Sequence, residues 1–110
     1  MIYSGGCHCG RNKFEVEGDL KKVMDCNCSI CTMRGYLHWG VLSQKLQLIT
    51  PESNLATYTF KSGMVKHHFC PICGCAPLVS SPDGVYVNAR CLEGVDLTTL
   101  KVEPFDGRSL

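Results

Sequence analysis

The sequence lacks the features by which several large classes of protein are recognised. Only 19% of its residues are charged, and its 11 lysines and arginines and 10 aspartates and glutamates are spread along the chain without a dense basic run. A phosphate backbone would find little to hold it, so we expect no nucleic-acid partner. No apolar stretch approaches the roughly 20 residues of a membrane-spanning helix, so we expect no membrane insertion.

The first residues also lack the basic start and the apolar stretch of a secretory signal peptide. The number of cysteines, nine, is odd, and most of them stand within three residues of another. This combination is unusual for a disulfide-bonded secreted protein and favours a reducing compartment and metal binding. We therefore predict a cytoplasmic protein.

With 110 residues, the chain has the length of one domain, and we predict a single domain over residues 1–110. Its apolar content of 45% is ordinary for a globular protein. A domain of this size has a modest core, and a bound metal ion would add to its stability. A structural zinc site contributes on the order of 10–16 kcal/mol, which exceeds the net stability of most domains.

Short β-prone runs bounded by turn residues recur along the chain and predict an all-β domain of several small antiparallel sheets. The expected strands are residues 13–17, 37–42, 46–50, 57–60, 64–69, 77–80 and 85–88. A glycine loop at residues 61–63 and a Pro-Asp-Gly turn at residues 81–84 indicate two hairpins. Only residues 96–100 resemble a helical turn, with Asp96 as its N-cap.

Seven of the nine cysteines form three close-set groups, and these groups carry most of the functional information. They are Cys7 and Cys9, then Cys26, Cys28 and Cys31, then Cys70 and Cys73. Cysteines at C-x-C spacing form a disulfide with each other only under strain, whereas their thiolates can share one cation. Zinc is the expected cation because it accepts sulfur ligands and imposes no geometry of its own. Two pairs supply four ligands for one closed site, and the triplet supplies three for a second.

A zinc ion held by three thiolates is a weak Lewis acid, which makes water activation a poor prediction for the triplet. Such an ion instead holds an incoming thiol as thiolate and positions it for attack on a carbon electrophile. We therefore predict that Cys26, Cys28 and Cys31 form a catalytic site for sulfur–carbon chemistry. Lys22 and Arg34 flank the triplet and are candidates to contact the carboxylates of a peptide-like thiol, although either is equally an ordinary surface charge.

The alternative is that a fourth ligand from the protein closes the triplet site. The candidates are Cys75, Cys91, His8, His38, His67 and His68. His67 and His68 are neighbours on an expected strand, so one faces the core and the other the solvent. We expect His8 to be exposed beside the first site.

The arrangement resembles the glutathione-dependent formaldehyde-activating enzyme family, also called the centromere protein V family. The matching segments run in order through nearly the whole chain: residues 6–10 with 14–16, 26–31, 69–74, 87–96 and 105–108. Three cysteine motifs in this order and spacing are a specific signal, which a lone C-x-x-C is not.

The resemblance implies an Mss4-like β-tent fold organised around zinc. It implies two zinc ions per chain: a structural ion on Cys7, Cys9, Cys70 and Cys73, and an exchangeable ion on Cys26, Cys28 and Cys31. It also implies a carbon–sulfur lyase that joins glutathione and formaldehyde as S-(hydroxymethyl)glutathione, with glutathione or a similar small thiol as partner. The alternatives are a zinc-stabilised binding module and a redox or metal sensor that uses the triplet without catalysis.

Overall fold

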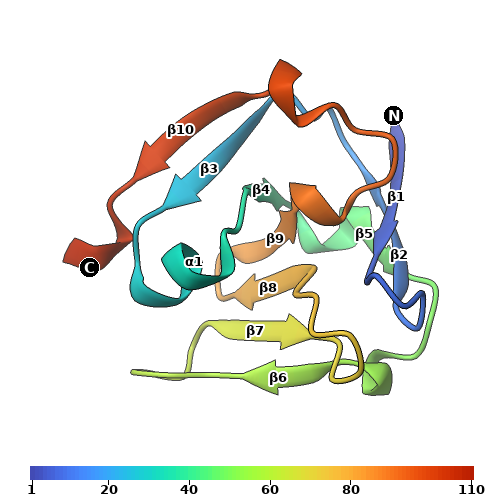
Figure 1. Cartoon of the computed structure of the whole chain (residues 1–110), viewed down its shortest axis with the longest axis horizontal. Helices are drawn as coiled ribbons and strands as arrows, with labels where there is room; N and C mark the ends of the chain where they lie inside the picture. The colour runs from blue at the N-terminus through green and yellow to red at the C-terminus, as the bar shows by residue number, and fades with distance from the viewer.

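The computed structural model describes residues 1–110 and shows a mostly β protein with two sheets (Figure 1). The small sheet has the order β1-β2-β5 and stands at the right of the view. The large sheet has the order β10-β3-β4-β9-β8-β7-β6. No helix is long and apolar enough to cross a membrane.

The strands of the small sheet are β1 (Ile2–Gly6), β2 (Lys13–Glu17) and β5 (Leu46–Leu48). Those of the large sheet are β3 (Lys22–Cys26), β4 (His38–Val41), β6 (Ala56–Tyr58), β7 (Lys66–Phe69), β8 (Leu78–Ser81), β9 (Gly84–Asn88) and β10 (Lys101–Phe105). One α-helix, α1 (Ser29–Arg34), and five 3-10 turns connect them: η1 (Ser43–Lys45), η2 (Glu52–Asn54), η3 (Ala89–Cys91), η4 (Leu97–Thr99) and η5 (Gly107–Ser109).

The two faces of the large sheet differ because side chains alternate along each strand. Trp39 on β4 stands opposite Val87 on β9, and both side chains are buried. They pack with Phe14 and Val16 of the small sheet in the main hydrophobic core. One face of the large sheet is therefore covered by the small sheet.

The opposite face carries the intervening residues of the same strands. Here His38 precedes Trp39, and Tyr86 precedes Val87. A second cluster of buried side chains lies on this side, formed by Cys26, Cys31, Tyr36, Ala76 and Val79. Two of the predicted site cysteines thus belong to the packing of this face.

The all-β prediction is confirmed, and each expected strand overlaps an observed one. The strand predicted at residues 13–17 is β2, and Asp96 caps η4 by accepting a hydrogen bond from the backbone N–H of Thr98. The predicted strand 64–69 is shorter, because β7 begins at Lys66 and the preceding loop is longer than three residues.

The sequence prediction did not include β1, β3, β10 or α1. Of these, β3 and β10 pair in parallel, with Met24 beside Glu103 and Cys26 beside Phe105. This pair is the exception to the antiparallel arrangement, since all other strand pairs are antiparallel. A contact between segments about 80 residues apart leaves no local sequence pattern.

Val87 tests the importance of the layer between the sheets, since its side chain has no exposed surface. We expect Val87→Ala to lower the free energy of unfolding by about 2 kcal/mol, through lost apolar burial and the cavity left behind. The matched control, Val102→Ala on β10, removes a side chain that is 47% exposed and should change stability by less than about 0.5 kcal/mol. Denaturant titration measures both, and equal losses would contradict this account of the core.

Candidate metal centres and the adjoining cavity

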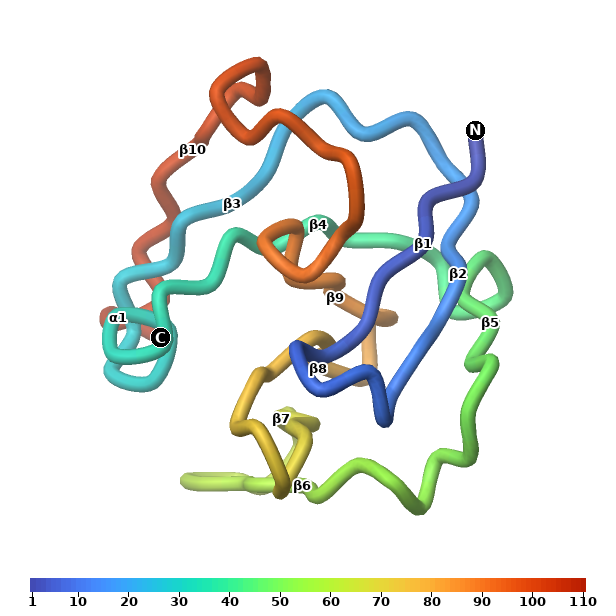
Figure 2. The backbone as a smooth tube through the Cα atoms, turned by 45° about the vertical axis from the view of Figure 1, so that its right-hand side comes forward, coloured from blue at the N-terminus to red at the C-terminus, as the bar shows by residue number.

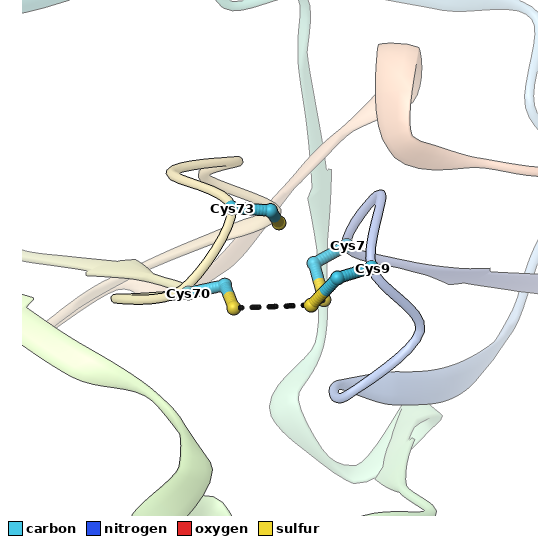
Figure 3. Close-up of side chains that lie close together, drawn as sticks. All are labelled: Cys7, Cys9, Cys70 and Cys73. Atoms are coloured by element: carbon cyan, nitrogen blue, oxygen red, sulfur yellow. Dashed lines mark hydrogen bonds between the residues drawn. The ribbon is translucent and has the colours of Figure 1, made fainter.

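Cys7, Cys9, Cys70 and Cys73 come together from two turns that are far apart in the sequence (Figure 3). Their four sulfur atoms lie within 4.8 Å of one another. The Sγ of Cys9 is 3.6 Å from that of Cys7 and 3.7 Å from that of Cys70. Tetrahedral zinc with Zn–S bonds of about 2.3 Å requires about 3.8 Å between sulfurs, whereas a disulfide requires about 2.05 Å. The spacing therefore fits a shared metal ion.

The turns that carry these cysteines are set by glycine and by backbone hydrogen bonds. Gly74 leaves the second turn with a φ of +83°, which favours glycine, and its N–H donates to the carbonyl of Cys70 at 2.8 Å. The backbone N–H of Cys75, and then that of Cys9, lower the pKa of Cys73 to about 5. Backbone donors thus favour the thiolate that metal binding needs.

Cys26, Cys28 and Cys31 form the second group, and their sulfurs also lie within 4.8 Å of one another. Cys26 ends β3, Cys28 is the N-cap of α1, and Cys31 lies within that helix. The helix brings Cys28 and Cys31 to one side because residues three apart are neighbours on a helical surface. Two features of the sequence could have indicated α1. One is the C-x-C-x-x-C spacing, and the other is Gly35, which forms the left-handed C-cap of the helix.

The chemistry of the triplet also fits a cation. Cys26 and Cys31 are buried, and Cys28 is partly exposed. Burial, followed by the neighbouring Cys28, raises the pKa of Cys31 above its usual value. Three thiolates this close repel one another unless a positive ion offsets their charge.

None of the six candidates for a fourth protein ligand joins the three sulfurs in a common group. His38 comes nearest, with its Nε2 at 3.3 Å from the Sγ of Cys31. Burial lowers the pKa of His38 to about 4, so its ring is neutral. His8 is exposed, as predicted, and Cys75 and Cys91 lie outside both groups.

His67 and His68 were predicted to face opposite sides of their strand. His67 is 3% exposed, and its Nδ1 lies 3.3 Å from the hydroxyl of Tyr36. His68 is less buried, and its Nε2 lies 2.8 Å from the hydroxyl of Ser80. Arg34, which is exposed, also donates to the Tyr36 hydroxyl, at 2.8 Å.

A cavity of about 440 Å³ reaches the triplet. All three cysteines line it, together with His38, His67 and apolar side chains that include Phe60, Val65, Tyr86 and Phe105. A ligand in this cavity can therefore approach the three sulfurs. The cavity was not predicted from the sequence, which offered His38 and His67 only as candidate fourth ligands, because it depends on strands that meet only in the folded sheet.

The turn η5 packs directly against the triplet, and it lies beside α1 in Figures 1 and 2. A Cβ atom on Gly107 would lie only 2.5 Å from the Sγ of Cys26. The side chain of Asn27 fastens this turn: its Nδ2 donates to Asp106 Oδ1 at 2.9 Å, and its Oδ1 accepts from the N–H of Arg108 at 2.8 Å. Gly107 is thus required for the close approach of η5 to the cysteines.

The comparisons with known proteins agree with this geometry. The profile of the family described as glutathione-dependent formaldehyde-activating enzyme matches residues 2–104. The chain belongs to this family. A crystal structure of a Rhodobacter sphaeroides protein, a structural genomics target, is similar to it with a TM-score of 0.80 and 30% sequence identity. That similarity covers 91% of this chain and 99% of the other.

The family match and the two sulfur groups support a coarse functional statement. The family acts with glutathione and formaldehyde, so a small thiol is the kind of partner to expect. Both cysteine groups of this chain could hold metal ions. The resemblance recognised in the sequence is confirmed, and so is the Mss4-like fold that it implied.

Gly107 offers a selective test of the triplet. We expect Gly107→Ala to lower the number of bound metal ions by one per chain, because the new methyl group displaces the Sγ of Cys26. Ser109→Ala is the matched control: it removes a hydrogen bond to Asp106 in the same turn without crowding a cysteine. Metal analysis of the purified variants measures the difference. An unchanged metal content in Gly107→Ala would contradict the proposed contact.

Proposed function

We propose that this chain is a single zinc-binding domain that acts as a zinc-dependent carbon–sulfur lyase on a small thiol adduct, such as S-(hydroxymethyl)glutathione. In this proposal Cys7, Cys9, Cys70 and Cys73 hold a structural zinc ion, and Cys26, Cys28 and Cys31 hold an exchangeable catalytic one. The observation that carries the proposal is the cavity that opens onto the three-cysteine group, which has no fourth protein ligand.

The two groups differ in ways that suit these roles. The four-cysteine group joins the turn after β1 to the turn after β7, and Cys70 within it has no exposed surface. An ion there would link the small sheet to the large one and contribute to folding. The triplet lies on one short segment, residues 26–31, so an ion there closes no long loop. Its loss should leave the fold in place.

The reaction joins a thiol to the carbonyl carbon of formaldehyde. A lone pair of the sulfur forms the C–S bond, the π electrons of the C=O bond move to oxygen, and that oxygen takes up the proton that the thiol released. The lyase direction is the reverse. Zinc bound at the triplet would supply a thiolate at neutral pH by lowering the pKa of the substrate thiol.

His67 is placed to handle the proton. It lines the cavity, and its contact with Tyr36 uses Nδ1, which leaves Nε2 facing a ligand. Burial lowers the pKa of His67, so its ring is neutral near pH 7. In the tautomer whose Nδ1–H donates to the Tyr36 hydroxyl, Nε2 is unprotonated and can accept a proton. Ten of the seventeen residues that line the cavity are hydrophobic, which lowers the polarity around the forming C–S bond.

A second candidate function is a redox or metal sensor, and the proximity of the three free thiols favours it. Oxidation of the triplet would release its ion without any substrate. Titration of the metal-loaded protein with a small thiol distinguishes the two functions, because a thiol that adds to the bound metal supports the enzymatic function. We also propose that the protein works in a reducing compartment such as the cytoplasm, because its metal-binding thiols must stay reduced.

Cys28 tests the division of roles. We expect Cys28→Ala to abolish thiol-dependent formaldehyde turnover and to remove the more readily chelated metal ion, while the melting temperature stays within a few degrees of the unaltered protein. Cys70→Ala should instead lower the melting temperature sharply or prevent folding, because the four-cysteine group joins the two sheets. Metal analysis, calorimetry and an activity assay measure these effects, and turnover retained by Cys28→Ala would refute the catalytic role.

His67→Gln tests the proton-handling role, since glutamine retains hydrogen bonding but does not accept a proton near neutral pH. We expect kcat to fall by about 10²-fold, with little change in thiol affinity or metal content. His68→Gln on the adjacent, less buried position is the control and should keep nearly full turnover. A loss in both variants would point to a disturbed β7 instead of a specific role for His67.

A further inference from the structure

A second cavity, of about 600 Å³, lies beside the one that reaches the triplet. The two cavities share four lining residues: Met24, His38, Tyr86 and Phe105. Met24 stands opposite His38 and beside Glu103, so these side chains lie on the same face of the large sheet. The two cavities therefore adjoin along this face, and we refer to the pair as the trough.

The trough changes in character along β3. Side chains two residues apart on a strand point to the same face, which here carries Lys22, Met24 and Cys26. Cys26 lies at the triplet end of the trough, and Lys22 lies at the other end. The four residue steps from Lys22 to Cys26 correspond to about 13 Å of strand. A fully extended tripeptide spans about 10–11 Å, and the lysine side chain adds several ångströms of reach. A peptide-sized thiol can therefore contact both ends at once.

The charged groups of the trough lie mainly in the second cavity. The Nζ of Lys22 is 3.4 Å from Glu103 Oε1, and the Nζ of Lys21 is 3.3 Å from Asp19 Oδ2. The cavity at the triplet is mostly apolar and has one cation, Lys61, and one anion, Asp83, among its lining residues. The far end of the trough thus presents adjacent positive and negative groups, which suit a ligand end that carries both charges.

We propose that the cavity beside Lys22 and Glu103 binds the charged end of the thiol substrate, a group with an ammonium and a carboxylate such as the α-amino-acid end of a short peptide. Lys22 donates to the carboxylate, and Glu103 accepts from the ammonium. Met24, His38, Tyr86 and Phe105 form the uncharged section between this end and the sulfur. The proposal rests on the proposed function, because it assumes that the sulfur lies at the triplet.

Three probes separate the two ends of the trough. Glutathione has both a thiol and charged ends, 2-mercaptoethanol has only the thiol, and S-methylglutathione has only the charged ends. Binding is measured by calorimetric titration of the metal-loaded protein, and thiol capture by the sulfur-to-metal charge-transfer absorption of the cobalt-loaded form. These measurements do not depend on turnover.

We expect Lys22→Glu to weaken the binding of glutathione and of S-methylglutathione by about fivefold or more, because it replaces an attraction to the ligand carboxylate by a repulsion. Binding of 2-mercaptoethanol should change less than about twofold, and Lys22→Arg should retain the affinity for all three. Lys45→Glu is the matched control, since Lys45 makes a similar exposed ion pair with Glu17 on the small sheet. It should alter none of the three.

Two results would overturn the proposal. In the first, Lys22→Glu weakens the binding of glutathione and of 2-mercaptoethanol equally. In the second, it changes the binding of neither glutathione nor S-methylglutathione. If neither thiol changes the charge-transfer absorption of the unaltered protein, the proposed function itself fails. S-methylglutathione still reports on the second cavity in that case, and binding that is insensitive to Lys22→Glu would refute the subsite independently.

Discussion

The alternation of side chains across the seven-stranded sheet is the constraint on which both the core and the site depend. Trp39 and Val87 face the small sheet and are buried with it, which commits their neighbours His38 and Tyr86 to the other face. A shift of one residue in the pairing of β4 and β9 would exchange these sets, placing a histidine in the core and a tryptophan in the cavity. The packing of the apolar face therefore fixes the polar side chains of the site without any contact to them.

The cysteines are placed at the ends of elements, where the backbone can turn. Cys7 follows β1, Cys70 follows β7, and Cys26 ends β3. Between them, the strands act as rigid spacers that bring residues 61 positions apart into contact, as for Cys9 and Cys70. The same logic applies to η5, which reaches the triplet because β10 runs alongside β3 and delivers the chain next to Cys26.

The parts of the protein that sequence predicts well are those that local chemistry decides. Alternation at residues 13–17 and the cap at Asp96 depend on neighbours a few positions away, and both were predicted. The grouping of the cysteines was also apparent, since close spacing itself suggests a shared ion. In contrast, α1 is only six residues long, and its sequence has too little periodicity to distinguish a helix from a metal-binding turn. The parallel pairing of β10, the contact of Gly107 with Cys26 and the approach of His38 to Cys31 depend on tertiary packing alone.

The surroundings of His38 bear on whether the triplet receives its fourth ligand from inside or outside the chain. The ring stacks on Tyr36 at 4.6 Å between centroids and meets the edge of Tyr86 at 5.7 Å. Its Nδ1 is buried without a hydrogen-bond partner, so stacking on the two tyrosines and the contact of Nε2 with Cys31 hold the ring in place. The Nε2 of the ring lies 3.3 Å from the Sγ of Cys31, but His38 does not join all three sulfurs in a common group. The cavity reaches all three cysteines, so a thiol from solution can approach each of them. The proposed open site depends on this access, and a small movement of His38 toward the sulfurs would compete with it.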